Sequence, residues 1–259
     1  MAITKEPMIF GGWVKARIAG TNAAFQKVGL VSTLQRTVET NKLTLPDTTT
    51  PQGGEYDSFE RVTSVSLAIN FRELYSWVLA LLNWGTLSAV PATTVTGEAH
   101  VAEVNGTIVL DKMPLTIDGV SNAAGTTDFD EFDDWVMTGS GIEVVSGGAL
   151  ETAIKAAAPG TPYLVSVDYS SAAVDVVEAL TNSGEKLEII YEGENGVGSG
   201  GRLIDRYFIC KMNPAATSDW INTDDYGGME STLSVQRDDT KVGAGTSKYW
   251  KTMKERVAA

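Results

Sequence analysis

Apolar and polar residues alternate along several stretches of the chain, and this period of two is typical of β-strands with one buried face. The clearest stretch is RVTSVSLAINF, where one side carries Val65, Leu67, Ile69 and Phe71. PYLVSVDYS places Tyr163, Val165, Val167 and Tyr169 on one face, and MESTLSVQRDD does the same with Met229, Leu233 and Val235. GLVSTLQRTVE, LEIIYEGE and RLIDRYFICKMNP are further predicted strands. The pattern therefore predicts a mostly antiparallel β-structure.

The period changes to that of a helix directly after the first of these strands. In RELYSWVLALLNW one helical stripe contains Leu74, Trp77, Val78, Leu81 and Leu82. We expect this core helix to pack its stripe against the sheet. Weaker patterns predict a second helix in GALETAIKAA and a basic C-terminal helix at about 247–257, in which Tyr249, Met253 and Val257 share a face.

A long segment without a regular pattern, about 41–60, lies between two predicted strands. It is rich in Thr, Pro and Gly, and structureless loops longer than about 12–15 residues are uncommon unless they are functional or disordered. Its apolar side chains would be costly to leave in water, so we expect a flexible arm that becomes ordered against a neighbouring molecule. The candidate contact residues of this loop are Leu43, Leu45, Tyr56 and Phe59.

Composition supports a folded chain and argues against nucleic-acid recognition. The 259 residues are 43% apolar, which is enough for an ample core, and no linker or repeat divides them, so we expect 1–259 to form one α+β domain. The net charge of −13 repels phosphates at long range. The first residues lack a signal-peptide pattern, and the longest apolar run, WVLALL, is too short to span a bilayer. We therefore expect synthesis in the cytoplasm and no membrane partner.

The single cysteine and the single histidine limit the available chemistry. Cys210 lies in an apolar predicted strand, so we expect a buried thiol and no internal disulfide. His100 alone excludes a site that needs two imidazoles, and we interpret it as structural.

GVGSGG at 196–201 matches the spacing G-x-G-x-x-G of dinucleotide-binding turns. Such a phosphate site needs a strand before the glycines and a helix after them. The segment that follows, RLIDRYFICKMNP, is aromatic and β-branched and predicts a strand. We therefore expect the glycines to close a turn between two strands.

The stretch DFDEFDDW gathers carboxylates, namely Asp128, Asp130, Glu131, Asp133 and Asp134. A calcium loop would need an oxygen ligand at the position of Phe132 and a glycine directly after it. We expect a solvated acidic loop, without metal or cofactor.

The elbow G-x-S-x-G is absent, and the adjacent pairs Asp224–Asp225 and Asp238–Asp239 fit turns better than a shared substrate site. No catalytic residues are predicted, so we expect a protein that is not an enzyme.

Several stretches, taken in order from about Gly29 to Tyr249, resemble the tail tube proteins (major tail proteins) of bacteriophages with long non-contractile tails. They are GLVSTLQRTVETNKL with the loop after it, RVTSVSLAINFRELYSWVLALLNWG, VTGEAHVAEVNGTIVLDK, PYLVSVDYSSAAVDVVEALTNSGEKLEIIYEGENG and FICKMNPAATSDWINTDDYGGMESTLSVQRDDTK. The third stretch contains Asn105-Gly106, a favoured two-residue hairpin turn. The acidic stretch at 128–135 and the basic C-terminal end depart from the family pattern.

The resemblance implies a tail-tube-like β-sandwich or barrel with one packed helix and a long extended loop that reaches an adjacent ring. It also implies a structural protein without catalysis or cofactor, whose hexameric rings stack into the tail tube through which DNA is ejected into the host. The implied location is the phage tail of the virion, after assembly in the bacterial cytoplasm. The implied partners are other copies, the tape measure protein, and the tail terminator and tail tip proteins. Viral DNA would pass through the lumen without specific binding.

Two other hypotheses stay open at this point. One is a different ring component of a phage tail or a related tube, such as a terminator or hub. The other is a carbohydrate-binding β-domain, for which the only hint is six scattered tryptophans, Trp13, Trp77, Trp84, Trp135, Trp220 and Trp250.

The interpretation of GVGSGG leads to a first test. We expect isothermal titration calorimetry to detect no binding of NAD or another dinucleotide to the intact protein, and Gly198→Ala to leave that result unchanged. Micromolar binding of any dinucleotide would show that the glycines hold a phosphate.

Overall fold

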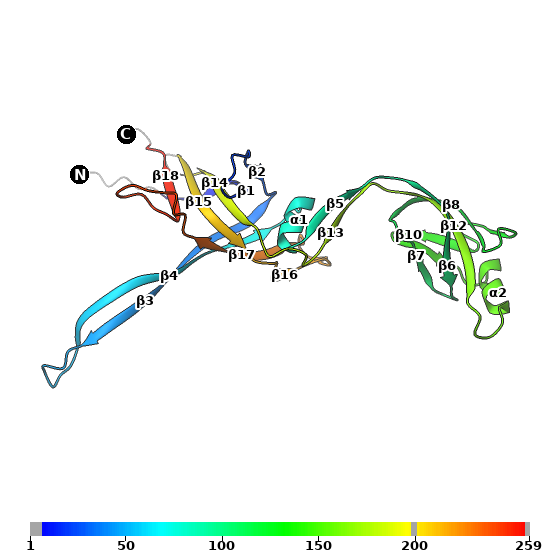
Figure 1. Ribbon diagram of the computed structural model, residues 1–259, viewed down its shortest axis with the longest axis horizontal. Coiled ribbons are helices and arrows are strands. Elements are labelled where there is room, and N and C mark those ends of the chain that lie inside the picture. The colour runs from blue at the N-terminus through cyan, green and yellow to red at the C-terminus, as the bar shows by residue number, and fades with distance from the viewer. Residues whose placement is uncertain (1–6, 198–200, 257–259) are drawn as a thin grey trace. The chain divides into compact units, whose positions relative to one another are not determined.

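The computed structural model describes residues 7–197 and 201–256 (Figure 1). The predicted α+β class with mostly antiparallel strands is confirmed. The chain divides into two compact units, which are described separately. Unit 1 comprises Met1–Leu87 and Val177–Ala259, and unit 2 comprises Ser88–Val176.

The sequence predicts one domain, whereas the structure has these two units. The chain leaves unit 1 along β5 (Thr86–Val90) and returns along β13 (Val174–Glu178), and these two strands pair with each other. A connection made of paired strands needs no stretch rich in Pro, Gly or Ser. The sequence pattern of a flexible linker is therefore missing at this boundary.

Unit 1 is built on a nine-stranded sheet with the path β2-β1-β14-β15-β17-β4-β3, to which β16 adds on β17 and β18 on β15. Its strands are β1 (Phe10–Ile18), β2 (Gln26–Lys27), β3 (Val31–Pro46), β4 (Glu55–Phe71), β14 (Lys186–Asn195), β15 (Arg202–Met212), β16 (Thr217–Ser218), β17 (Met229–Gln236) and β18 (Trp250–Lys254). Strands β1 and β4 are far apart on this path, yet Val14 and Leu67 belong to the same buried cluster. The sheet therefore curves around one core.

The predicted alternation in β4 and β17 is confirmed by burial. The buried residues are Val65, Leu67, Ile69 and Phe71 in β4 and Met229, Leu233 and Val235 in β17. Ser231 shares that inward face, and its hydroxyl donates a hydrogen bond of 2.7 Å to the carbonyl of Asn213. A polar group in the core is tolerated here because its hydrogen bond is made.

Helix α1 (Ser76–Leu82) covers this core, as predicted, but only part of its predicted stripe is buried. Val78 and Leu82 are buried, and Trp77 and Leu81 pack at the margin of the core. Leu74 is exposed because the helix begins only at Ser76, so its assignment to the stripe is wrong.

The predicted C-terminal helix at about 247–257 is wrong. Its central residues form β18, which pairs antiparallel with β15 and places Trp250 opposite Tyr207. The two aromatic rings stack with centroids 6.5 Å apart. This contact with the core outweighs the weak helical spacing of Tyr249 and Met253. Val257 lies outside the described residues.

The predicted loop at about 41–60 is also wrong, because these residues form the far end of the β3–β4 hairpin. Strands β3 and β4 stay in register as far as Pro46 opposite Glu55, and Asp47–Gly54 form the turn. The Asp47 amide donates to the Gly54 carbonyl at 2.8 Å. Strand β17 pairs with β4 only from Ser66 onward, so residues 40–62, here called the arm, extend beyond the rest of the sheet (Figure 1).

Unit 2 contains two sheets that share one core, as in a β-sandwich. Its elements are β6 (Thr94–Ala102), β7 (Thr107–Val109), β8 (Pro114–Asn122), β9 (Asp128–Phe129), β10 (Trp135–Thr138), β11 (Gly141–Val144), the predicted helix α2 (Ala149–Ala156) and β12 (Tyr163–Ser171). The sheets have the orders β6-β12-β8-β9 and β10-β11-β7. The alternation predicted in β12 is confirmed, since Val165, Val167 and Tyr169 are fully buried.

The hairpin predicted at Asn105-Gly106 is only partly right. Asn105 has a φ of 55°, as a tight turn requires. However, β6 pairs with β12 and β7 pairs with β11, so the turn joins two sheets rather than two partners in one sheet.

Burial along α1 predicts unequal effects of two leucine truncations. Leu82→Ala removes a fully buried side chain and should lower the free energy of unfolding by about 2–5 kcal/mol. Leu81→Ala should cost less, because Leu81 lines an open cavity of about 410 Å³ and its packing is already incomplete. Urea unfolding of both variants checks this order, and equal losses would contradict it.

Candidate functional site

The arm carries a row of uncovered apolar side chains. Leu43 lies directly opposite Phe59, and Leu45 follows two residues later on the same face. These three side chains are 55%, 63% and 56% exposed, and Tyr56 near the turn is 69% exposed. Val62, which the sequence interpretation missed, is 59% exposed as well. All four candidates named from sequence therefore lie on one ordered hairpin and contact no core.

Polar interactions of its own hold the arm in shape. The Lys42 ammonium lies 2.8 Å from the Glu55 carboxylate, and this contact lowers the pKa of Glu55. At the turn the Asp47 carboxylate accepts hydrogen bonds from the hydroxyl and the amide of Thr49, which lower its pKa. Because these contacts do not involve the apolar face, Leu43, Leu45 and Phe59 are presented to solvent on a preformed surface.

The sheet of unit 1 also has open edges. Within the described residues, β3 pairs only with β4, and the outer edge of β1 is paired only near its middle. There Lys15 and Ala16 pair with β2, and the Val28 amide donates to the Val14 carbonyl. Unpaired strand edges expose backbone N–H and C=O groups that can pair with a strand of another molecule. The arm and these edges together make the candidate assembly surface of unit 1.

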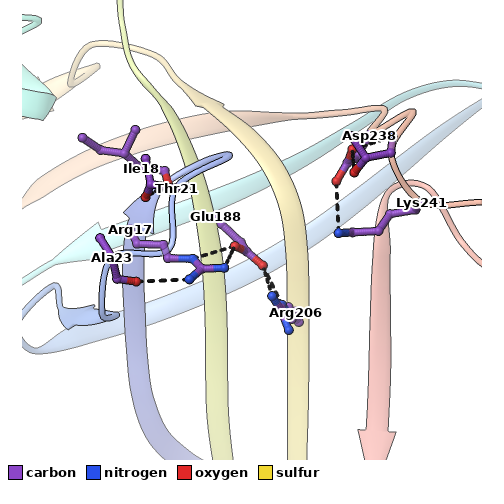
Figure 2. Close-up of polar contacts among 9 residues, drawn as sticks. Arg17, Ile18, Thr21, Ala23, Glu188, Arg206, Asp238 and Lys241 are labelled. Atoms are coloured by element: carbon purple, nitrogen blue, oxygen red, sulfur yellow. Dashed lines mark hydrogen bonds and ion pairs between the residues drawn. The ribbon is translucent and has the colours of Figure 1, made fainter.

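An Arg–Glu–Arg triad bridges three strands of the same sheet (Figure 2). The carboxylate of Glu188 on β14 is 2.6 Å from the Arg17 guanidinium on β1 and 2.5 Å from that of Arg206 on β15. Arg17 also donates to the Ala23 carbonyl and lies over the ring of Phe25 at 4.5 Å. Glu188 is only 5% exposed, so its charge must be paired. With two arginines on one carboxylate, the triad retains a net positive charge.

His100, predicted to be structural, belongs to a hydrogen-bonded cluster in unit 2. Its Nε2 lies 2.6 Å from one oxygen of Glu98, and the Tyr169 hydroxyl donates to the other oxygen at 2.6 Å. The Asp111 amide also donates to Glu98, at 2.9 Å. Burial opposes ionisation of Glu98, but these hydrogen bonds outweigh it and lower the pKa of the carboxyl. Burial and the bond to Glu98 raise the pKa of Tyr169 to about 12. The cluster ties β6 to β12.

The acidic stretch is only partly the solvated loop that its sequence predicts. Asp128, Asp130, Glu131 and Asp133 are exposed, but Asp134 is buried. One oxygen of Asp134 accepts from the amides of Ala149 (2.5 Å) and Leu150 (3.2 Å), at the beginning of α2. Gly148 at the N-cap has no side chain to do this, so Asp134 caps the helix from another segment.

The other sequence candidates occupy structural positions. The strand after GVGSGG is confirmed, because β14 and β15 pair antiparallel from Glu194 opposite Arg202, while Gly198, Ser199 and Gly200 lie outside the described residues. Cys210 is buried, and burial raises the pKa of its thiol to about 12. The amides of Asp224 and Asp225 both donate to the Asn222 side chain, as in a turn.

Among the tryptophans, Trp135 is buried, Trp77, Trp84 and Trp250 are half-buried, and Trp13 and Trp220 are exposed.

Two further features are absent from the part of the chain that the structure describes. Within residues 7–197 and 201–256, no three His, Cys, Asp or Glu side chains are grouped so that they could hold a metal ion. Neither described helix has the length and apolar character needed to cross a membrane.

Residues 7–253 match a family model described as "Protein of unknown function UCP028589". The chain belongs to this family. No curated protein matches the chain. The matched range includes both compact units, so the family shares unit 2 as well as the sheet that carries the arm.

The Glu98 cluster predicts a pH-dependent effect of Glu98→Gln. The folded pKa of Glu98 lies below its ordinary value of 4.5, so the ionised carboxylate stabilises the fold above that value, and this contribution is lost as the pH falls through the folded pKa. The variant should lose about 1–3 kcal/mol at neutral pH. Chemical denaturation near neutral pH and near pH 3 measures this loss, which should shrink at the lower pH. An equal loss at both pH values would contradict the assignment.

Proposed function

We propose that this protein is a structural subunit that assembles with copies of itself into stacked rings that form a tube. The observation that carries the proposal is the arm, an ordered hairpin with an apolar face that no described residue of unit 1 covers. An exposed apolar patch of this kind marks a surface that another molecule covers. The tail tube of a long-tailed bacteriophage is the assembly that the sequence resembles.

The arm is suited to contacts between rings. It extends beyond the last strand that supports it, and its apolar residues lie at the far end, so they reach away from the core of unit 1. The chain does not have to fold on assembly, because the hairpin is already ordered. Burial of Leu43, Leu45 and Phe59 against the next ring then contributes apolar free energy without the cost of ordering the segment.

The open edges of the sheet support ring closure. When a strand edge of one copy pairs with an edge of the next, the contact is heterologous, and such contacts close into a ring if the rotation per copy is right. Six copies per ring follow from the resemblance alone. A role in the virion, with tape measure, terminator and tail tip proteins as partners, belongs to the same proposal.

The charge of the chain agrees with a conduit for DNA. Each Lys or Arg that contacts a phosphate adds affinity and slows passage, and the net charge of −13 keeps the average surface repulsive to DNA. The arm also favours a repeating subunit over a terminator, because a terminator ends the tube and a repeating subunit must engage another ring.

Substitutions on the two faces of the arm test the proposal. Leu43→Ser with Phe59→Ser should abolish tube formation, seen by negative-stain electron microscopy, because the apolar contact between rings is lost. The melting temperature should stay within error of the parent protein, since both side chains are exposed in the free chain.

A matched control lies on the other face of the same hairpin. Thr44 and Ser58 are direct partners there, and Thr44→Ala with Ser58→Ala should leave tubes intact. A stronger variant replaces residues 42–60 with an Asn-Gly turn between the partners Asn41 and Arg61. If this shortened protein, or the Leu43/Phe59 variant, still builds tubes of normal length, the arm does not join rings.

A further inference from the structure

The face of the unit 1 sheet that points away from its core carries a row of cations. Lys15 on β1 lies opposite Ile190 on β14, Ile190 lies opposite Arg206 on β15, and Arg206 lies opposite Lys251 on β18. The neighbouring row on this face contains Trp13, Glu192, Ile204 and Met253. Like charges directly opposite each other, as in Arg206 and Lys251, destabilise a sheet unless an anion lies between them.

This surface, here called the basic face, consists of Lys15, Arg17, Lys27, Arg206 and Lys251. Two carboxylates neutralise part of it, since Glu188 is shared by the two arginines (Figure 2) and Glu192 pairs with Lys15 at 2.7 Å. Lys27 lies 3.7 Å from the centre of the Trp13 ring. Lys251 has no ion pair within the residues that the structure covers. The cations outnumber the carboxylates here, although the chain as a whole has a net charge of −13.

Unit 2 presents a surface of the opposite kind. Residues 128–134, here called the acidic knuckle, expose Asp128, Asp130, Glu131 and Asp133, and none of these has an ion pair in the described part of the chain. Between them Phe132 is 74% exposed with a φ of 72°. A bulky non-glycine residue in the left-handed region is strained, and such strain is concentrated at functional positions.

The acidic knuckle is held in a fixed shape. The Phe132 amide donates to the Trp135 carbonyl at 2.7 Å, and the Asp134 amide donates to the Asp130 carbonyl at 2.9 Å. Asp134 is anchored to the beginning of α2, and the Trp135 indole donates to the Phe129 carbonyl at 2.9 Å. The exposed phenyl ring and the carboxylates beside it are therefore preorganised for binding, which lowers the entropy lost on contact.

We propose that the acidic knuckle of one copy docks on the basic face of a second copy. Its carboxylates would lie against Lys251 and the net positive charge of the Arg17–Glu188–Arg206 triad. Phe132 would pack on Trp13, Ile204 and Met253, in the row that also contains Glu192, whose charge is paired with Lys15. A second copy is the occupant that the chain's own charge complementarity supports, because one chain carries both surfaces. The contact goes beyond the tube proposal, since the arm takes no part in it.

A charge exchange tests the proposal in the full-length protein. Glu131→Lys and Lys251→Glu should each lower the association constant at least tenfold. In the double variant the charges are exchanged, so its association constant should lie within about threefold of that of the parent protein. Sedimentation velocity in about 50 mM NaCl measures the association constants, and raising the salt should weaken them because exposed charges are screened. Phe132→Ser should weaken association without changing the melting temperature. Glu103→Lys is the matched control, because it makes the same charge change at another exposed site of unit 2.

The same measurements in the Leu43→Ser/Phe59→Ser background separate this contact from the arm. If association in this background is still weakened by salt and still responds to the Glu131→Lys and Lys251→Glu exchange, the proposed contact of the acidic knuckle is supported, even if no tube forms. Tubes that form normally with Glu131→Lys would overturn the knuckle and leave the tube proposal standing. A double variant that does not recover, or a parent protein that remains monomeric in low salt at about 100 µM, would also overturn it. If the parent protein remains monomeric, the basic face would instead bind an acidic partner other than a second copy.

Discussion

The antiparallel pairing of β3 with β4 is the interaction on which the proposed role of this protein depends. From Val65 to Phe71 the pairing is supported by a core, but beyond Val65 only the two strands hold each other. Isolated two-stranded hairpins are marginal in water. The arm is continuous with a nine-stranded sheet, and the Lys42–Glu55 ion pair and the Asp47 turn add local support. This continuity allows an uncovered apolar face to remain ordered.

Sequence patterns predicted the structure well where one face of a strand is buried and the other is not. The alternation in β12 and in the C-terminal half of β4 is of this kind. The inward apolar positions were identified there, although Tyr163 is only partly buried and the buried Ser171 of β12 was missed. In the arm both faces are exposed, so burial selects no alternation. Irregularities in register near Thr40 and Pro46 interrupt the period further. Leu43, Leu45, Tyr56 and Phe59 were found, but as members of a loop, and Val62 was missed.

Long-range contacts explain the remaining differences. Asp134 is buried because it caps a helix that begins at Ala149, and no local pattern distinguishes it from its four exposed acidic neighbours. Glu188 is buried because strands from both ends of the sequence bring Arg17 and Arg206 to it. Near the C-terminus, Trp250 of β18 pairs with Tyr207 of β15, and the local spacing of apolar residues could not predict this long-range contact. Asp134 was therefore expected in a solvated loop and the segment around Trp250 in a helix, and Glu188 was not singled out.

The overall charge of the chain conceals how its charges are arranged. A net charge of −13 predicts repulsion of nucleic acid, but it gives no sign that cations gather on one face of the unit 1 sheet while exposed carboxylates gather in unit 2. Surfaces of opposite sign and an apolar arm on one chain are the features from which we propose that copies of this protein contact each other in more than one way. The family model matches residues 7–253 and therefore includes unit 2, which indicates that unit 2 is a common part of the family.

Electron microscopy of the purified, unmodified protein over a range of concentrations tests the central claim most directly. The account predicts closed rings that stack into tubes as the concentration rises, with the arm ordered between successive rings in a three-dimensional reconstruction. Discrete monomers at every concentration, or an assembly in which Leu43 and Phe59 remain exposed to solvent, would contradict it.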